Sequence, residues 1–535
     1  MANLSTHPHQ ATSPNTSAVQ PSLDGVRTHS SWGLAAFCSL LLILELGAAA
    51  LGPYGYYIDE PYYLAGARRL AWGYVDHPPL SLLILRATTA ILGNSMVAIR
   101  LPAALAGAAT AFMTGRMARQ LGGGLFAQLM AAACLFVGPG YLILFGFFSM
   151  NAFEVLAWAS IATLLIDALA AQTRGRGTRE FVLLGIVFGA AALNKHSALL
   201  YAAALALGLL FSSSRRVLST RGPWLALALA LLLLLPNIVW QGTHAWISLD
   251  FYRLQGSKNI DTPVLLGILN QALFINPAAL PFCVVGLWSL LSTPASAKHR
   301  AFAVAYLLLL GCLLALHSSR ADRIAGAYPV LFAAGAVVLE RYTRTRALLW
   351  RVALVSGLVF GGAGLLPLAL PILQPPVAAR YAQALGVVPQ IEREAAALPE
   401  WLAERLGWPE LVAAIADVAH QLPPEEQRRA VVLASSYDIA GAVELFGPAR
   451  GLRRVLSPHN SYLLWGQEHA TDPSDIVIAV GFSEALLRKH FREVQAAGQR
   501  RCDVCLGDSP DVALFVVREP LAPISNLPSA LRRIR

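Results

Sequence analysis

Long apolar segments alternate with short polar connections through the first 370 residues of the chain. A membrane-spanning helix needs about 20 mostly apolar residues, so the pattern predicts an all-α, polytopic membrane domain with about eleven spans. Residues 181–211 also allow another interpretation, one tilted helix followed by a re-entrant turn, because both halves are short. The predicted spans are 33–52, 98–118, 125–145, 150–171, 181–194, 197–211, 224–240, 272–292, 301–317, 324–340 and 348–370.

Lysine and arginine side chains gather in every second connection between these segments. Positive charge is enriched in the cytoplasmic loops of membrane proteins and sets the orientation of their helices. We therefore expect these connections and the amino terminus in the cytoplasm, and the region after residue 370 on the outer side. The basic clusters are Arg116 and Arg119; Arg174, Arg176 and Arg179; Arg215, Arg216 and Arg221; Lys298 and Arg300; and Arg341, Arg344 and Arg346.

The first outer connection, Tyr54 to Leu80, is unusually rich in charged residues and tyrosines. It leads into an apolar stretch, Leu80 to Leu92, that is only about half the length needed to span a membrane. If this stretch were a span, the arginine pattern after it would invert. We expect a juxtamembrane helix that lies against the outer surface and ends near Gly93.

Composition supports a membrane protein and excludes an ordinary soluble one. The 535 residues are 56% hydrophobic and only 13% charged, with a mean hydropathy of +0.55. The net charge of +10 does not indicate nucleic-acid binding, since the basic residues follow the connections between spans. Residues 1–31 are polar and too long and too weakly basic for the start of a signal peptide, and we expect a disordered cytoplasmic tail.

The character of the chain changes after residue 370. Three buried-strand patterns (430–436, 475–481 and 511–517) alternate with two amphipathic helix patterns (409–422 and 483–495). This alternation predicts a soluble α/β domain with a mainly parallel sheet over 371–535, after a membrane domain over 32–370.

Two of the six cysteines form a C-x-x-C motif, Cys502 and Cys505, in this outer domain. An oxidising compartment favours a local disulfide over a catalytic or zinc-binding role, because no second motif or histidine pair accompanies it. The sequence therefore predicts a Cys502–Cys505 disulfide. No histidine or cysteine spacing in the chain requires a metal site.

Ionisable residues concentrate on the predicted outer side of the membrane domain. Charges near a membrane boundary are costly unless they are solvated or paired, and they often mark a substrate path. A carboxylate can take a proton from a hydroxyl group while cations hold a phosphate leaving group. The candidates are the acidic pair Asp59 and Glu60, the pair Asp76 and His77, the polar residues Asn151 and Glu154, and the cations Arg100, Lys195, Arg320 and Arg323.

Each candidate also has a structural interpretation, which the residue types alone leave open. A charged group at the membrane border can be solvated at a helix end, can extend to the interface, or can form a polar pair between helices. These interpretations apply to Asp59 with Glu60, Asp76 with His77, Asn151 with Glu154, Lys195, and Arg320 with Arg323.

Several motifs nevertheless resemble one known group of enzymes. IDEPYYLAGARRLAWGYVDHPPL (58–80) and IRLPAALAG (99–107) are similar to the first outer loop of family 39 GT-C glycosyltransferases. This group includes protein O-mannosyltransferases and lipid A aminoarabinose transferases. FSMNAFEVLAW (148–158), LNKHSALL (193–200) and AYPVLFAAGA (327–336) resemble later motifs of bacterial members. The likeness extends over most of residues 33–340.

The resemblance implies an inverting transferase that uses a polyprenyl-phosphate-linked sugar. Asp59 would be the catalytic base, and its neighbour Glu60 would tune the pKa of Asp59 or bind the acceptor. Asp76 and His77 would contact the sugar or the acceptor, while Lys195 would bind phosphate. Two positions depart from the family pattern. Asn151 stands where members often have aspartate, and SSRADRIAGAYP (318–329) replaces a K-x-Y-Y element, so that Arg320 or Arg323 would supply the positive charge.

The expected partners follow from the same resemblance: a lipid-linked sugar donor, membrane lipid, and an acceptor hydroxyl on a glycolipid, protein or polysaccharide. No cofactor is predicted, and the need for a divalent metal is left open. The expected location is the bacterial inner membrane, with the carboxyl-terminal domain in the periplasm. One alternative is a transporter or lipid flippase, since many spans with outer charges also suit a substrate pathway. Another is a non-catalytic member of the group whose outer α/β domain binds cell-wall components.

Overall fold

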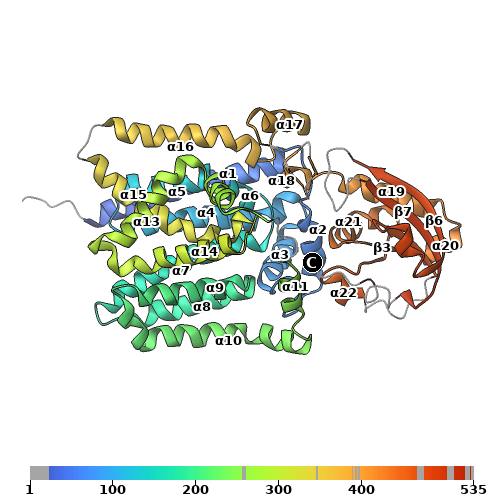
Figure 1. Ribbon diagram of the computed structural model, residues 1–535, viewed down its shortest axis with the longest axis horizontal. Helices are drawn as coiled ribbons and strands as arrows, with labels where there is room; N and C mark the ends of the chain where they lie inside the picture. Colours follow the sequence, from blue (N-terminus) through green and yellow to red (C-terminus); the bar gives the residue numbers. More distant parts are fainter. Residues whose placement is uncertain are drawn as a thin grey trace, which may run out of the picture.

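The computed structural model describes residues 23–255, 261–344, 348–387, 390–391, 394–395, 398–466, 475–502, 511–524 and 531. It has two parts: a large helical domain and a smaller domain built on a β-sheet, with the short helices of the first loop between them (Figure 1). The predicted all-α membrane domain followed by an α/β domain is therefore confirmed. Of the predicted tail, residues 1–22 lie outside the described residues, and helix α1 begins at Leu23.

Seven described helical segments are long and apolar enough to cross a membrane. Each lies within one helix, or within a helix and the 3-10 turn before it. They are Trp32–Leu51 in α1 (Leu23–Leu51), α4 (Met96–Gln120), α7 (Met150–Gln172), α10 (Arg221–Thr243), η4 (Pro294–His299) with α14 (Arg300–Ala315), η5 (Ala321–Ala327) with α15 (Tyr328–Arg344), and α16 (Leu348–Ala369).

The predicted spans 181–194 and 197–211 form two short helices. These are α8 (Thr178–Asn194) and α9 (Ser197–Leu210), with 17 and 14 residues, and a single turn joins them at Lys195 and His196. Both are shorter than the ~20 residues of a typical span. The chain between Gln172 and Arg221 thus forms two separate helices and not one tilted helix. It continues through the 3-10 turn η1 (Arg215–Ser219) into α10.

Two predicted spans are bent. The segment 125–145 forms α5 (Leu125–Val137) and α6 (Pro139–Phe145), with a bend of 74°. The segment predicted as 272–292 belongs to a pair bent by 86°, α12 (Val264–Ile275) and η3 (Pro277–Ala279) with α13 (Leu280–Ser292). With each pair counted as one span, the described residues contain up to nine spans rather than eleven.

One asparagine joins the two bends. Asn276 has a φ of 75°, and its side-chain amide donates to the Val137 carbonyl at 2.8 Å. Its side-chain oxygen accepts from the Ala278 N–H at 2.9 Å. Proline lacks an N–H and therefore breaks the helical ladder at Pro139 and Pro277. The buried Asn276 side chain satisfies backbone groups that these breaks would leave without a partner.

The helices pack closely inside and are apolar outside. Cβ atoms built on Gly286 of α13 and Gly335 of α15 would lie 2.0 Å from the Leu331 carbonyl oxygen and 1.9 Å from the Phe282 carbonyl oxygen. Only glycine allows these two helices to approach so closely, as is typical of helix packing in membranes. Large apolar side chains are exposed on the outer faces of α10, α12 and α16, which indicates contact with lipid.

The first loop contains two helices, α2 (Asp59–Arg68) and α3 (Leu80–Leu92). The predicted juxtamembrane helix is present as α3, and its C-cap is Gly93, with a φ of 78°. Helix α3 buries Leu82 and Leu85 and exposes Leu83, Ile91 and Leu92. Another short helix, α11 (Ile247–Gln255), which is not part of the first loop, lies at the same end of the helical domain (Figure 1).

The carboxyl-terminal domain contains a five-stranded sheet with the order β4-β3-β5-β7-β6. The strands are β3 (Val431–Ala434), β4 (Val455–Leu456), β5 (Ile476–Val480), β6 (Phe491–Arg501) and β7 (Asp511–Pro520). Strand β3 pairs in parallel with β4 and β5, whereas β7 runs antiparallel to β5 and β6. The three predicted strands are confirmed, but the sheet is mixed and not mainly parallel.

The predicted helix at 483–495 is wrong. Only Glu484–Leu487 is helical, as α23, and the chain continues as β6. Strand β6 lies at the sheet edge and is exposed at most of its positions, so its sequence has no regular strand pattern. Pairing with β7, which the local sequence does not encode, stabilises the strand.

Short helices connect the strands and link the domains. They are α17 (Pro375–Ala384), α18 (Glu400–Ala403), α19 (Trp408–His420), α20 (Pro424–Arg429), α21 (Tyr437–Phe446), the 3-10 turn η6 (Pro448–Arg450) and α22 (Tyr462–Trp465). Helix α19 confirms the amphipathic pattern at 409–422. The two-residue strands β1 (Gln390–Ile391) and β2 (Glu394–Ala395) pair between α17 and α18. Helix α21 faces α2 of the first loop (Figure 1).

Candidate active site

The two adjacent acidic residues of the first loop begin helix α2. Negative charge in the first turn is favourable because the helix dipole is positive there. Adjacent residues on a helix point in different directions, and the two carboxylates accordingly have different neighbours. Asp59 is partly buried and accepts a hydrogen bond from the Tyr437 hydroxyl at 2.7 Å, whereas Glu60 is fully buried in the helical domain.

Glu60 and Arg100 form a buried ion pair. The Arg100 guanidinium donates to the two Glu60 carboxylate oxygens at 2.9 and 2.7 Å, and the backbone N–H groups of Phe148 and Tyr57 donate to the same carboxylate at 2.9 and 2.8 Å. Burial raises the pKa of Glu60, but Arg100, Arg405 and the Phe148 N–H outweigh it and hold the pKa below its usual value. This pair joins the loop to α4.

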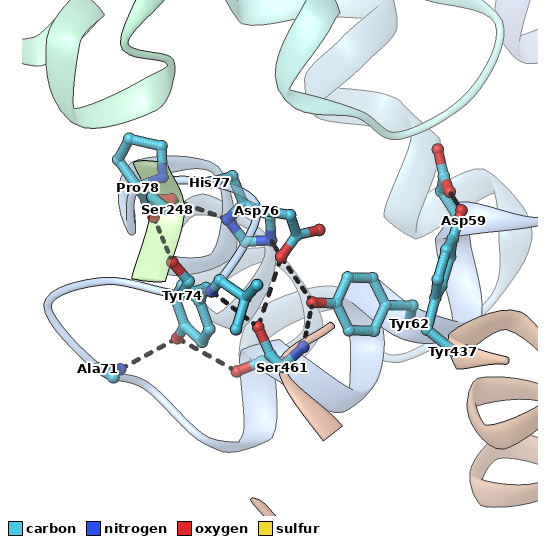
Figure 2. A network of polar contacts seen from close by, with 12 residues as sticks. Asp59, Tyr62, Ala71, Tyr74, Asp76, His77, Pro78, Ser248, Tyr437 and Ser461 are labelled. Carbon is cyan, nitrogen blue, oxygen red and sulfur yellow. Dashed lines mark hydrogen bonds and ion pairs between the residues drawn. The ribbon is translucent and has the colours of Figure 1, made fainter. Parts of the chain in front are cut away.

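Asp76 and His77 belong to a network that includes the carboxyl-terminal domain (Figure 2). Tyr62 of α2 donates its hydroxyl to Asp76 Oδ1 at 2.7 Å. Ser461, which precedes α22, donates to the same oxygen at 3.4 Å and accepts from the Val75 N–H at 3.1 Å. His77 is buried, with Nδ1 2.9 Å from the Pro78 carbonyl oxygen. This arrangement exposes Asp76 slightly and encloses the imidazole.

Three of the predicted polar residues meet at the start of α7 and the end of α8. Lys195 donates to Asn151 Oδ1 at 2.8 Å and to Glu154 Oε2 at 2.6 Å. The Ser197 hydroxyl also donates to Glu154. The Lys195 side chain is 22% exposed and Glu154 is 7% exposed. The ammonium group is therefore held in place, on a side chain that remains partly exposed.

The remaining predicted cations lie on the segment before α15. The Arg320 guanidinium donates to both carboxylate oxygens of Asp322, at 2.8 and 2.9 Å. Asp322 is also close enough to Lys195 and Arg323 to interact with their charges. Arg320 is thus bonded to Asp322, and Lys195 and Arg323 are close enough to act on the same carboxylate.

Two side chains, Tyr63 and Glu404, interact with both the acidic and the cationic groups. The charges of Asp59, Asp76 and Arg320 all act on the Tyr63 phenol, whose pKa burial and the two carboxylates raise well above its usual value. Asp59 and Arg320 both act on Glu404 as well, whose pKa is raised by burial and by Glu400. The candidate base Asp59 and the cation Arg320 therefore lie close to the same two side chains.

Four site residues of the carboxyl-terminal region were not predicted from the sequence. Tyr437 contacts Asp59, Ser461 contacts Asp76, and Glu404 and Arg405 lie beside the first loop. Burial lowers the pKa of Arg405 to about 10. Tyr437 and Ser461 follow strands β3 and β4, where the carboxyl ends of parallel strands commonly bind ligands. Their place after these strands was the only feature of the sequence that could have indicated these residues, because hundreds of residues separate them from the loop.

Two other predictions concern cysteines and metals. Cys502 is disulfide-bonded, but Cys505 lies outside the described residues, so the predicted pairing stays a prediction. Among the described residues, no group of three or more histidine, cysteine, aspartate or glutamate side chains could hold a metal ion.

The comparisons with known proteins concern both sequence and fold. Residues 76–240 match the family model described as dolichyl-phosphate-mannose-protein mannosyltransferase. No curated protein sequence matches the chain. The structure is similar to that of ArnT from Cupriavidus metallidurans bound to undecaprenyl phosphate, with a TM-score of 0.55 at 14% identity over 90% of this chain and 97% of that one.

A second similar structure is the archaeal oligosaccharyltransferase AglB from Archaeoglobus fulgidus, in complex with an inhibitory peptide and a dolichol-phosphate. Its TM-score is 0.50 at 11% identity, over 83% of this chain and 69% of that one. At these identities the likeness concerns the fold. The predicted resemblance is thereby confirmed, and the chain has the fold of the GT-C superfamily of glycosyltransferases.

Proposed function

We propose that the protein is an inverting membrane glycosyltransferase, which moves a sugar from a polyprenyl-phosphate donor to an acceptor hydroxyl group. One observation carries the proposal. Asp59, a carboxylate at the membrane border, and the Arg320 guanidinium both act on Tyr63 and Glu404, and Arg320 is bonded to Asp322, on which Lys195 and Arg323 also act. Transfer with inversion requires both kinds of group, a base for the acceptor and positive charge for the phosphate.

The reaction can be assigned to these side chains. Asp59 takes the proton of the acceptor hydroxyl as its oxygen attacks the anomeric carbon of the donor. The bond between this carbon and the phosphate oxygen breaks, and the phosphate leaves with the electron pair. Because this leaving group is already anionic, it needs positive charge from Lys195, Arg320 or Arg323 rather than a strong acid. Glu60 positions the loop through its ion pair with Arg100. Asp76 and His77, the second polar pair of the loop, contact the sugar or the acceptor.

The donor class has further support from the comparison, because the similar ArnT structure contains undecaprenyl phosphate. A site at the border between lipid and water suits such a donor, whose prenyl chain stays in the membrane. The arginine clusters support a cytoplasmic amino terminus and an outer, periplasmic site in the bacterial inner membrane. The sugar, hexose or pentose, and the acceptor, whether glycolipid, protein or polysaccharide, are left open.

The test is donor turnover by the purified protein in lipid vesicles. Undecaprenyl-phosphate hexoses and pentoses serve as donors, a mixed envelope extract supplies acceptors, and release of undecaprenyl phosphate is measured. We expect Asp59→Asn to lower turnover about 100-fold or more, as for loss of a general base. Asp167→Asn is the matched control, because Asp167 pairs with Arg116 on the spans α7 and α4, away from the loop. Full turnover by folded Asp59→Asn contradicts the assignment, as does movement of the donor across vesicles without transfer.

A further inference from the structure

The carboxyl edge of the sheet in the α/β domain lies against the first loop of the membrane domain. Strands β3 and β4 are parallel neighbours, so their carboxyl ends meet at the same edge. The segment after β3 contains Tyr437, which bonds to Asp59, and the segment after β4 contains Ser461, which bonds to Asp76. Two of the loop's three candidate acidic residues, Asp59 and Asp76, are thus held from the same edge of one sheet.

The approach of the two domains is close and depends on a glycine. Gly441 lies one turn after Tyr437 on α21, on the same face of the helix. A Cβ atom built on Gly441 would lie 2.8 Å from the Tyr62 backbone nitrogen and 3.0 Å from the Pro61 carbonyl carbon. Any larger residue would push α21 away from α2. The sequence of α21 is therefore suited to place the Tyr437 hydroxyl against α2.

Tyr437 also packs within a group of aromatic side chains. Its ring centroid is 4.9 Å from that of Tyr62 and 5.0 Å from that of His459. Figure 2 shows Tyr62 and Tyr437 between Asp76 and Asp59, with each hydroxyl bonded to one carboxylate. Burial and the Asp59 charge raise the pKa of the Tyr437 phenol well above its usual value. The phenol therefore stays protonated at neutral pH and remains a hydrogen-bond donor.

We propose that the α/β domain completes the active site, with Tyr437 as a positioning residue that orients Asp59 and stabilises its ionised form. The inference rests on the proposed function, in which Asp59 is the base. A hydrogen bond donated to a carboxylate favours its charged state, and a bond to a charged group is stronger than one between neutral groups.

The ionisation of Asp59 also depends on the other groups that face it. From its own loop these are the phenols of Tyr57 and Tyr63, from the end of α18 the carboxylate of Glu404, and from α21 the phenol of Tyr437. Glu400, Asp438 and Arg320 each act on one or more of these same four groups. Replacement of Tyr437 by phenylalanine changes none of the other groups in this set.

The experiment compares Tyr437→Phe with Tyr462→Phe in the full-length protein, using the vesicle assay at pH 4.5 to 8.5. Tyr462 is a suitable control because its buried hydroxyl donates to Glu444 of the same domain and not to Asp59. We expect Tyr437→Phe to lower kcat about tenfold, with the donor KM unchanged. We also expect the acidic limb of the pH profile to move upward by about one unit, because the lost donor favoured the charged form. Tyr462→Phe should leave the limb in place.

The outcomes separate this inference from the proposed function. An unchanged kcat and pH profile in Tyr437→Phe overturns the inference alone, provided that the unmodified protein is active and Asp59→Asn is not. Equal losses in both variants with no shift of the limb also overturn it, because they indicate a merely structural role. If the unmodified protein transfers no sugar, or if Asp59→Asn stays active, the proposed function fails and this inference with it.

Discussion

The buried Glu60–Arg100 pair allows a quantitative prediction about stability. Arg100→Met keeps much of the apolar volume of the arginine and removes its charge. The substitution deletes three hydrogen bonds: two to Glu60, at 2.9 and 2.7 Å, and one from the guanidinium to the Gly55 carbonyl at 2.8 Å. Glu60 is then left with the Tyr57 and Phe148 N–H donors in a position with 0% exposure.

The magnitude follows from this burial. Breaking a buried ion pair by removing one partner costs about 3–5 kcal/mol of unfolding free energy, because a charge remains buried without compensation. The same helix provides the control. Arg116 pairs with Asp167 at 2.9 Å, but these side chains are 37% and 34% exposed, and such pairs contribute about 0–1 kcal/mol. We expect Arg100→Met to destabilise the protein by about 2–5 kcal/mol more than Arg116→Met.

The loss should also depend on pH. In the unmodified protein the pKa of Glu60 is lowered, so its contribution to stability is present above the unfolded value of about 4.3 and is lost as the pH falls through the folded value. Without Arg100, burial raises the pKa of Glu60 and only Arg405 and the backbone donors oppose it. Protonation of Glu60 then removes the unfavourable charge as the pH falls. The difference in unfolding free energy between the unmodified protein and Arg100→Met should therefore narrow from pH 7 to pH 4.

Unfolding of the purified proteins in mixed detergent micelles measures these differences, with increasing denaturing detergent at pH 7, 5.5 and 4. The double variant Glu60→Gln/Arg100→Met should recover part of the loss, since a neutral amide is less costly to bury than a carboxylate. Equal losses for Arg100→Met and Arg116→Met at pH 7 would refute the reasoning. A gap that widens as the pH falls would refute the assigned direction of the Glu60 pKa.

Three further predictions concern other contacts. Gly441→Ala should lower transfer activity and reduce stability by about 1–3 kcal/mol, because its Cβ would lie 2.8 Å from the Tyr62 nitrogen; turnover and detergent unfolding measure the two effects. Asn276→Ala should cost about 1–3 kcal/mol in the same unfolding assay, because the Val137 carbonyl loses its donor at 2.8 Å. Lys195→Met should raise the donor KM about tenfold or more, and Lys195→Arg much less, in steady-state kinetics, if the ammonium group binds phosphate.

Each of these substitutions has a control elsewhere in the chain. Gly311→Ala places its Cβ where no atom lies within 4 Å, Asn94→Ala changes an exposed asparagine, and Lys298→Met removes an exposed cation. A loss at a control as large as at its test position contradicts the contact that the prediction rests on. An unchanged donor KM in Lys195→Met removes Lys195 from the phosphate site.

The sequence predicts those features that a local pattern determines. Hydropathy alone locates most of the spans, and the half-length apolar stretch after Pro79 predicts α3. The bends at Gly138 and Asn276 are harder to predict, because a proline near the middle of an apolar segment can be tolerated or can break the helix. Strand β6 was missed for a related reason, since its stability comes from pairing with β7 rather than from its own residues.

Contacts between the two domains could not be predicted from the sequence. The loop motif indicates Asp59 as the candidate base, but Tyr437 lies 378 residues away along the chain, and no periodicity joins them. Helical geometry also gives Asp59 and Glu60 different roles, although they are adjacent acidic residues in the sequence. Because adjacent residues on α2 point in different directions, Glu60 is directed at Arg100 and Asp59 at Tyr437.

These two environments imply different consequences for the two carboxylates. Glu60 accepts four hydrogen bonds in a buried position, so a substrate could reach it only by breaking the connection between the loop and α4. Asp59 is partly exposed, and its donor comes from a different domain. Loss of charge at Glu60 should therefore reduce stability and activity together, whereas Asp59→Asn should abolish transfer in a protein that remains folded. Comparison of turnover with unfolding for Glu60→Gln and Asp59→Asn distinguishes the base from the residue that positions it.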